Sequence, residues 1–291
     1  DLKISNKRLL PENKHFAYLK ISEGCDRSCS FCAIPSIRGT HKSVPMEDLL
    51  EQAKFLVQSG AKELIVIAQD TTYYGIDIYG KRKLAELLEL LATQSGAEWI
   101  RLHYTYPAGF PTDIIDVMAK HKNICKYIDM PIQHVNNEIL SSMKRFHTKE
   151  DIENLINEFK SKMPDIHIRT TLISGYPGET IVEHKELKEF IKKHKFARLG
   201  VFTYSNEEGT EAANIKDNVK HLTKLKRMQE ILDLQEQISL ENNIQKIGKT
   251  FKVIIDEVGE DYLIARTEYD SPEVDNIVNI FIFHSFSFTF S

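Results

Sequence analysis

Short apolar runs rich in β-branched residues alternate with longer amphipathic stretches along most of the chain. The short runs have the length and composition of buried strands, and they cover residues 16–21, 63–68, 99–103, 127–130, 166–172 and 199–203. Stretches such as 46–59 and 180–193 repeat apolar residues at the i, i+3, i+4 spacing of a helix. This alternation predicts a parallel sheet with right-handed crossovers. Six β/α units, fewer than the eight of a closed barrel, predict an α/β fold with a partial, open barrel.

A different pattern follows the last of these strands. A helix is predicted from about Leu222 to Ile247, and two short β-like runs, 249–255 and 262–266, follow it with a turn at 257–261. This pattern predicts a small all-β appendage that begins with a hairpin. We therefore divide the chain into a linker remnant (1–14), the partial barrel (15–245) and the β appendage (246–291).

Polar residues and glycines follow each predicted strand of the barrel. In such barrels the chemistry gathers at the carboxyl ends of the strands. For any one residue a loop or capping role is the simpler explanation, and Thr180 is expected to cap the next helix. Together they predict a ring around one mouth, which includes Gln69, Asp70, Tyr104, Tyr106, Gln133, His134, Gly175 and Tyr204.

Composition and charge limit the class of protein. The chain has 291 residues, with 38 Lys and Arg against 42 Asp and Glu, and 42% of its residues are hydrophobic. No apolar run approaches the roughly 20 residues that cross a bilayer. Four cysteines in a chain of this length do not form a disulfide scaffold, so a reducing compartment is expected. These features predict a soluble, cytoplasmic, globular protein without a membrane partner.

Three of the four cysteines, Cys25, Cys29 and Cys32, lie within eight residues in a C-x3-C-x2-C pattern. A zinc site would need a fourth ligand, and structural zinc usually takes cysteines in separated pairs. Three thiolates instead suit a [4Fe–4S] cluster with one open iron. An open iron can chelate S-adenosylmethionine, and an electron from the cluster then yields a 5′-deoxyadenosyl radical. Phe31 is expected to shield the cluster, whereas the isolated Cys125 is expected to be a buried hydrophobe.

Several segments resemble the radical-SAM methylthiotransferases. They are GCDRSCSFCAIPSIRG (24–39), DMPIQHVNNEILSSMKR (129–145) and TTLISGYPGET (170–180). Within that family, IVIAQDTTYYG (65–75), LHYTYPAGFP (102–111) and RTEYDSPEVDN (266–276) resemble the RimO type, which modifies an aspartate of a small-subunit ribosomal protein. The resemblance extends over roughly residues 8–280.

The resemblance implies an enzyme that adds a methylthio group to the β-carbon of that aspartate. It implies that Cys25, Cys29 and Cys32 hold the radical [4Fe–4S] cluster, and that S-adenosylmethionine and a reductant such as flavodoxin or ferredoxin take part. Gln69 and Asp70 stand where many radical-SAM proteins carry a Gly-Gly-Glu that contacts the cofactor's amino group. Further cofactor or substrate candidates, each with an ordinary structural alternative, are His134, Arg145, Arg169, Gly175 and Tyr204.

Two features depart from the family pattern. Family members carry an amino-terminal domain with three more cysteines for a second, auxiliary cluster, and we expect this chain to be a fragment without it. At the other end, the β appendage resembles the start of a TRAM domain, which binds RNA in tRNA-modifying relatives. The sequence after about residue 281 resembles no family motif, and a frame error or cloning remnant is as good an explanation as a native strand.

Charge bears on the choice of substrate. The alternative is a tRNA adenosine methylthiotransferase, but residues 246–280 carry four basic and eight acidic side chains, a difference equal to the net charge of −4. An acidic surface suits a basic ribosomal protein better than RNA. A third hypothesis, from another class, is an iron–sulfur electron carrier or binding module. Ferredoxin-like carriers saturate each cluster with four cysteines, whereas only three are grouped here.

Overall fold

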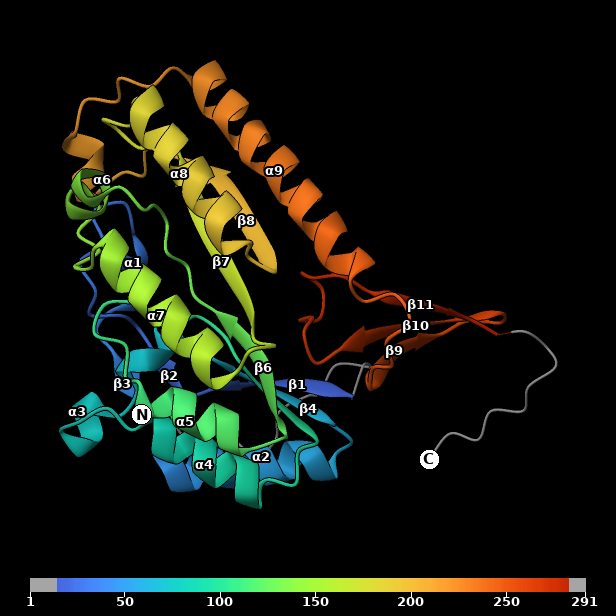
Figure 1. Cartoon of the computed structure of the whole chain (residues 1–291). Helices are drawn as coiled ribbons and strands as arrows, with labels where there is room; N and C mark the ends of the chain where they lie inside the picture. Colours follow the sequence, from blue (N-terminus) through green and yellow to red (C-terminus); the bar gives the residue numbers. More distant parts are fainter. Residues whose placement is uncertain (1–14, 283–291) are drawn as a thin grey trace.

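A parallel sheet forms the centre of the computed structural model, which describes residues 15–282. Its strands follow one another in space as in the sequence, β1-β4-β5-β6-β7-β8. All six predicted strands are confirmed, and Figure 1 shows them as the curved, open sheet of a partial barrel. Their bounds are β1 Phe16–Lys20, β4 Glu63–Ile67, β5 Trp99–Leu102, β6 Ile124–Asp129, β7 His167–Ser174 and β8 Arg198–Thr203.

Helices connect consecutive strands and bury their apolar stripes against the sheet. Strand β4 is buried on both faces, with Leu64, Ile65 and Val66 fully buried, so its sequence is a continuous apolar run. Strand β7 instead alternates buried and partly exposed residues. The crossover helices are α2 Met46–Gln58, α4 Leu84–Gln94, α5 Asp113–Lys120, α7 Lys149–Lys162 and α8 Ile181–His194. Shorter elements are α1 Ile34–Arg38, α3 Ile76–Tyr79, α6 Asn137–Ser142 and the 3₁₀ turns Thr71–Tyr73 and Glu211–Asn214.

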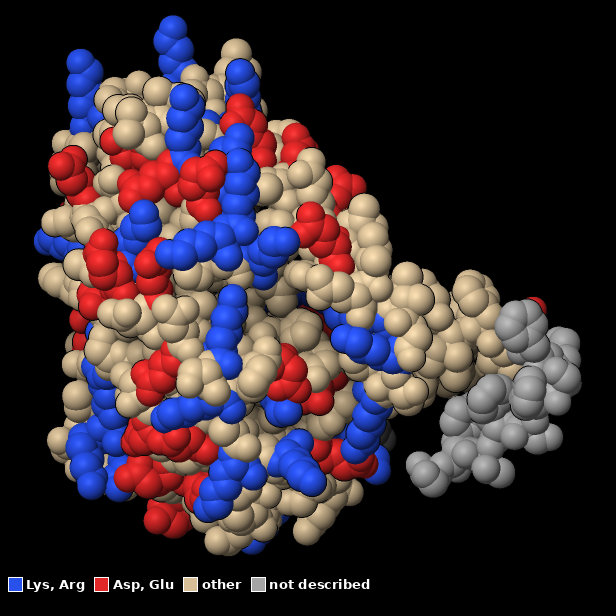
Figure 2. All heavy atoms as spheres, in the orientation of Figure 1, with Lys and Arg blue, Asp and Glu red and all other residues tan. Residues whose placement is uncertain are grey.

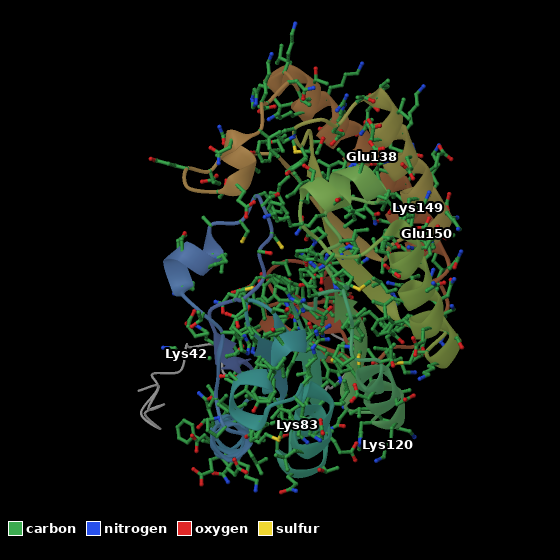
Figure 3. All side chains as sticks on the ribbon, turned by 90° about the vertical axis from the view of Figure 1, so that its left-hand side faces the viewer. Lys42, Lys83, Lys120, Glu138, Lys149 and Glu150 are labelled. Carbon is green, nitrogen blue, oxygen red and sulfur yellow. The ribbon has the colours of Figure 1, made fainter. Side chains whose placement is uncertain are left out.

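Side-chain caps fix where two of these helices begin. Thr180 forms a capping box with Glu183 at the start of α8, as its sequence position predicted. Thr148 and Asp151 form the same arrangement at the start of α7. Figure 3 shows Lys149 and Glu150 of α7 near Glu138 of α6, so the starts of these two helices lie together.

The C-terminal part is a three-stranded antiparallel sheet in the order β11-β10-β9, reached through the long helix α9, His221–Ile244 (Figure 1). Its strands are β9 Val253–Val258, β10 Tyr262–Thr267 and β11 Val278–Phe281. The predicted hairpin is confirmed. The first strand lies later than predicted, because residues through Val258 pair with β10 and shorten the turn to 259–261. The predicted atypical tail lies outside the described residues after 282, as does the predicted linker remnant 1–14.

A buried ion network joins this sheet to the barrel. The carboxylate of Glu63 in β4 lies 2.6 Å from Nε of Arg101 in β5 and 2.8 Å from Nη1 of Arg266 in β10. All three side chains are almost completely buried. Arg101 also donates a 2.8 Å hydrogen bond to the carbonyl of Glu268. The segment after β10 therefore packs directly against the barrel strands.

The acidic residues of residues 246–280 do not form one acidic surface, and the expectation of such a surface is wrong for three of them. Asp256 pairs with Arg266, Asp270 with Arg198 and Asp275 with Arg169, so these carboxylates face inward. Figure 2 agrees: the visible face of the protruding C-terminal sheet is mostly uncharged, whereas Lys, Arg, Asp and Glu are mixed over the rest.

Within residues 15–282 no helix is both long enough and apolar enough to span a membrane.

Candidate active site

The loop that carries the three cysteines is closed at its base by a short antiparallel ladder. Strands β2 Ser22–Glu23 and β3 Lys42–Ser43 pair on either side of the loop. The amide of Cys25 donates to the carbonyl of Gly39 at 3.1 Å. Gly24 has φ of +78°, and a Cβ there would collide with the Thr40 carbonyl, so this position requires glycine. The ladder holds the loop against the carboxyl end of β1.

All three cysteines of the loop line one cavity of about 670 Å³. They are free thiols and partly buried. The other walls come largely from the carboxyl ends of the neighbouring strands, and five residues of the predicted ring lie on them: Gln69, Asp70, Tyr104, Tyr106 and Gln133. Of the predicted site residues, this cavity brings together Cys25, Cys29, Phe31, Cys32, Gln69, Asp70, Arg145 and Arg169.

Two arginines lie around Tyr106, next to Cys29. Nη1 of Arg145 donates to Cys29 Sγ at 3.4 Å, and the Tyr106 hydroxyl lies 3.7 Å from the same sulfur. The guanidinium groups of Arg27 and Arg145 lie 4.0 Å and 4.1 Å from the centroid of the Tyr106 ring. Such contacts are attractive cation–π interactions. Both cations therefore sit beside the thiols at fixed positions.

The donor set fits an iron–sulfur cluster. Burial raises the pKa of Cys25 to about 11 and also raises the pKa of Cys32. Without a metal, burial therefore favours the neutral thiol form of Cys25 and Cys32. Binding of a metal centre would deprotonate them, because cysteine ligates metals as the thiolate. Arginine donors next to cysteine sulfur suit the negative charge that thiolates carry on such a centre. Cysteine thiols on a roomy cavity, next to these cations, therefore fit an iron–sulfur cluster.

Gln69 and Asp70 line the cavity, but their side chains already have protein partners. Asp70 accepts a 2.7 Å hydrogen bond from Nε of Arg27 and a 2.9 Å bond from the Thr72 amide, which starts a 3₁₀ turn. Gln69 donates to Glu23 at 3.1 Å. Asp70 therefore orients Arg27 beside the cysteine loop. A contact of either residue with the cofactor's amino group stays a prediction.

Arg169 of β7 connects the cavity to the C-terminal segment. Its Nη1 lies 2.6 Å from Asp275, and its Nε lies 3.6 Å from Asp129 at the end of β6. Tyr127 donates a further hydrogen bond to Asp275 at 2.8 Å. Burial raises the pKa of Asp129 to about 6. The C-terminal segment thus fixes the position of a cavity side chain.

The structure places the other three predicted residues outside this cavity, in structural roles. His134 is fully buried, its Nδ1 accepts from the Asn136 amide at 3.0 Å, and burial lowers its pKa to about 4. Gly175 has φ of +75°, and a Cβ there would collide with Lys224. Tyr204 packs edge-on against Tyr176 at 5.4 Å between centroids. For these three the ordinary structural alternative is the one that the contacts support.

Arg27 and Phe202 are among the cavity residues that sequence reasoning missed. Arg27 lies inside the cysteine loop, and its charge between two metal-ligand candidates was an available signal. Phe202 belongs to β8, where the sequence predicts that an apolar residue is part of the core, yet 65% of its surface is exposed. Its exposure at a strand end depends on the sheet's curvature, which the sequence alone does not give.

Comparison with known proteins assigns the chain to a class. The sequence pattern of the radical SAM superfamily matches residues 19–191, more than half of the chain, so the chain belongs to that superfamily. Membership implies a [4Fe–4S] cluster and S-adenosylmethionine, in agreement with the cysteine cavity. The TRAM domain pattern matches residues 247–283, which include the C-terminal sheet.

Within this superfamily, the chain is highly similar in sequence to one type of enzyme. The chain is 54% identical over 274 residues to the ribosomal protein uS12 methylthiotransferase RimO of Christiangramia forsetii, covering 94% of this chain and 61% of that protein. It is 52% identical to the protein of the same name from Bacteroides thetaiotaomicron, covering 92% of this chain and 62% of that protein. The chain therefore spans about three fifths of the length of these relatives.

Solved structures agree on the barrel. Coproporphyrinogen III oxidase (HemN) from Escherichia coli superposes with a TM-score of 0.56 at 20% identity, covering 77% of this chain and 52% of that one. The radical S-adenosylmethionine methyltransferase TsrM from Kitasatospora setae gives 0.55 at 17% identity, covering 65% and 36%. At these identities the likeness shows the fold alone.

Proposed function

We propose that this chain is the radical-SAM and TRAM part of a methylthiotransferase that modifies the β-carbon of an aspartate in ribosomal protein uS12. The observation that carries the proposal is the group of three cysteines on one cavity, in a chain 54% identical to a uS12 methylthiotransferase. The charge of residues 246–280 supports the choice of a basic protein over RNA less strongly than this observation does. Three of the carboxylates that were counted, Asp256, Asp270 and Asp275, pair with arginines inside the protein.

Each cavity residue has a role in this proposal. Cys25, Cys29 and Cys32 are the cluster ligands, and Arg145 donates to Cys29 Sγ, so its guanidinium lies against a ligand sulfur. Asp70 holds Arg27 against the Tyr106 ring. When bound, the cluster supplies the electron that cleaves S-adenosylmethionine into methionine and a 5′-deoxyadenosyl radical. The cavity walls then shield the reacting groups from water.

Other parts of the proposal rest on the family rather than on contacts. We infer an auxiliary cluster from the longer relatives, a reductant such as flavodoxin or ferredoxin, and a cytoplasmic location. We also propose that residues 15–245 form the radical-SAM domain and residues 246–291 the TRAM-like domain. Phe31, Gln69, Asp70, Arg145 and Arg169 stay candidates for contact with the cofactor or substrate.

The first test is anaerobic cleavage of S-adenosylmethionine. The chain is reconstituted with iron and sulfide and reduced, and 5′-deoxyadenosine is then quantified. We expect product from the parent and from Cys125→Ala, and none from Cys29→Ala. Cys125 is the matched control because it is buried among Trp99, Tyr127 and Ile254, in a cluster of its own. A well-formed cluster without product would contradict the proposal.

The second test identifies the substrate. Ribosomal protein uS12 carrying deuterium at its aspartate β-carbons is added to the same reaction. If the radical removes that hydrogen, deuterium appears in 5′-deoxyadenosine even without sulfur transfer. Deuterium-free product that increases with tRNA but not with uS12 would instead favour the tRNA adenosine activity.

A further inference from the structure

A second cavity, of about 470 Å³, lies at the end of the sheet opposite to the cysteines. Three connections form most of it: the segment 164–168 that enters β7, the segment 194–197 that enters β8, and the segment 242–251 that leads from α9 to the C-terminal sheet. Ile156 and Lys160 of α7 and Tyr269 after β10 complete the lining. Figure 1 shows where α9 runs into that sheet. The volume lies within the range of roughly 300–1,000 Å³ that small-molecule pockets occupy.

One side of this cavity is rich in lysine. Lys160 donates to the His194 carbonyl at 3.0 Å, and Lys195 pairs with Glu241 at 2.6 Å. Within the part of the chain that the structure describes, Lys246 and Lys249 pair with no carboxylate. The nearby carboxylates are already engaged, since Asp165 pairs with Lys126 at 2.8 Å and Asp270 pairs with Arg198.

The environment of Lys246 calls for an anion. Its side chain is partly buried, and burial together with the neighbouring Arg198 lowers its pKa. Lys249 acts in the same direction, whereas the carboxylate of Asp270, which is itself paired with Arg198, opposes the shift. Cations gathered at one cavity repel one another, and a bound anion would relieve that repulsion.

The other side of the cavity is aromatic and flat. His167 and Tyr269 stack with their centroids 4.0 Å apart and their planes 26° from parallel. Phe251 meets Tyr269 edge-on at 6.3 Å. The amides of Asn242 and Gln245 also line the cavity and can exchange hydrogen bonds with a heterocycle. A ligand with a planar ring and an anionic group would complement both sides, with the ring against the aromatic residues and the anion against the lysines.

We propose that this cavity binds a mononucleotide, with its phosphate at Lys246 and Lys249 and its base against the aromatic wall of His167, Tyr269 and Phe251. Phosphate is the anion that a pair of lysines holds well, and base stacking on aromatic side chains tolerates any base. The site lies where the barrel meets the C-terminal sheet, so the ligand contacts both. It goes beyond the proposed methylthiotransferase function and does not depend on it.

The test is calorimetric titration of the metal-free chain with adenosine 5′-monophosphate at low salt. We expect Lys246→Gln to weaken the affinity about tenfold, the loss of one charge-assisted contact. Lys120→Gln removes the same charge from the end of α5 (Figure 3), where Lys120 pairs with Glu89 on the surface, and should leave the affinity unchanged. Ribose 5-phosphate, which lacks the base, and Tyr269→Leu should each bind more weakly. Thermal melts confirm that each variant is folded, and the exposed Lys249→Gln serves as a second charge variant.

Four results would overturn the proposal. The first is the absence of binding at millimolar nucleotide. The second is inorganic phosphate binding as tightly as the nucleotide, which would remove the role of the aromatic wall. The third is displacement by S-adenosylmethionine, which would place the nucleotide in the cysteine cavity. The fourth is Lys246-dependent binding of a single-stranded RNA without binding of the mononucleotide, which would make this surface part of an RNA groove.

Discussion

Replacing Glu63 with glutamine should destabilise the protein by about 3 kcal/mol. The carboxylate lies between two buried guanidinium groups, those of Arg101 and Arg266. Removing one partner of a buried ion pair costs roughly 3–5 kcal/mol, because it leaves a charge without compensation. Arg266 keeps Asp256 at 2.7 Å, whereas Arg101 has no second carboxylate among the ion pairs of residues 15–282. One uncompensated cation places the expected loss at the lower end of that range.

Urea denaturation followed by tryptophan fluorescence measures this loss. Trp99, the single tryptophan, is buried against Ile254 of the C-terminal sheet, so its emission reports on the contact between sheet and barrel. A loss of about 3 kcal/mol should also lower Tm by roughly 6–12 °C in a protein of this size.

Glu98→Gln is the matched control. Glu98 also pairs with the C-terminal part, through Lys252 at 3.0 Å, but it lies on the surface. Exposed pairs contribute about 1 kcal/mol or less. The argument is refuted if Glu63→Gln and Glu98→Gln cost the same. It gains support if Arg101→Met, combined with Glu63→Leu, restores stability, since an apolar replacement of a buried ion pair is often neutral.

Three further predictions concern the site and its surroundings. Cys29→Ala should lose bound iron after reconstitution, whereas Cys125→Ala keeps it; equal iron in both variants would contradict the ligand assignment. Asp129 has its pKa raised by burial from 3.8 to about 6, so the folded protein holds an extra proton between these values, and the stability due to this group falls as the pH rises through them. The difference in unfolding free energy between the parent and Asp129→Asn should therefore change by about 2 kcal/mol from pH 4 to pH 7, and a constant difference would refute it. Gly175→Ala should cost about 1–3 kcal/mol in a thermal melt, because its φ of +75° is strained for alanine and its Cβ would collide with Lys224; an unchanged Tm would show that the loop yields.

The sequence predicted the features that depend on local pattern. The six strands were predictable because each is a short run rich in apolar and β-branched residues, and the cysteine group was predictable because its spacing is short. The capping role of Thr180 was equally local. Strand ends gave the mouth of the cavity, since parallel strands bring their carboxyl ends to one edge.

Features that depend on distant contacts were not predictable in this way. His134, Gly175 and Tyr204 follow strands as the true cavity residues do, yet they turn into the protein, against Asn136, Lys224 and Tyr176. Charge counting likewise failed for Asp275, whose partner Arg169 lies 106 residues earlier in the chain. A side chain's direction is set by packing that a single sequence does not display.

The segment 266–276 illustrates what the structure adds. In sequence it marked a resemblance to one type of enzyme; in the fold it lies beneath the cavity, with Asp275 paired to Arg169 and Ser271 within 3.0 Å of His103. Moving the C-terminal sheet relative to the barrel would break the buried pairs of Arg266 and Arg169 together. Breaking such pairs costs several kcal/mol, so a substrate would have to supply that energy to shift the sheet. The segment 266–276 therefore holds Arg169 in place from behind the cavity, and the C-terminal sheet is fixed relative to the barrel.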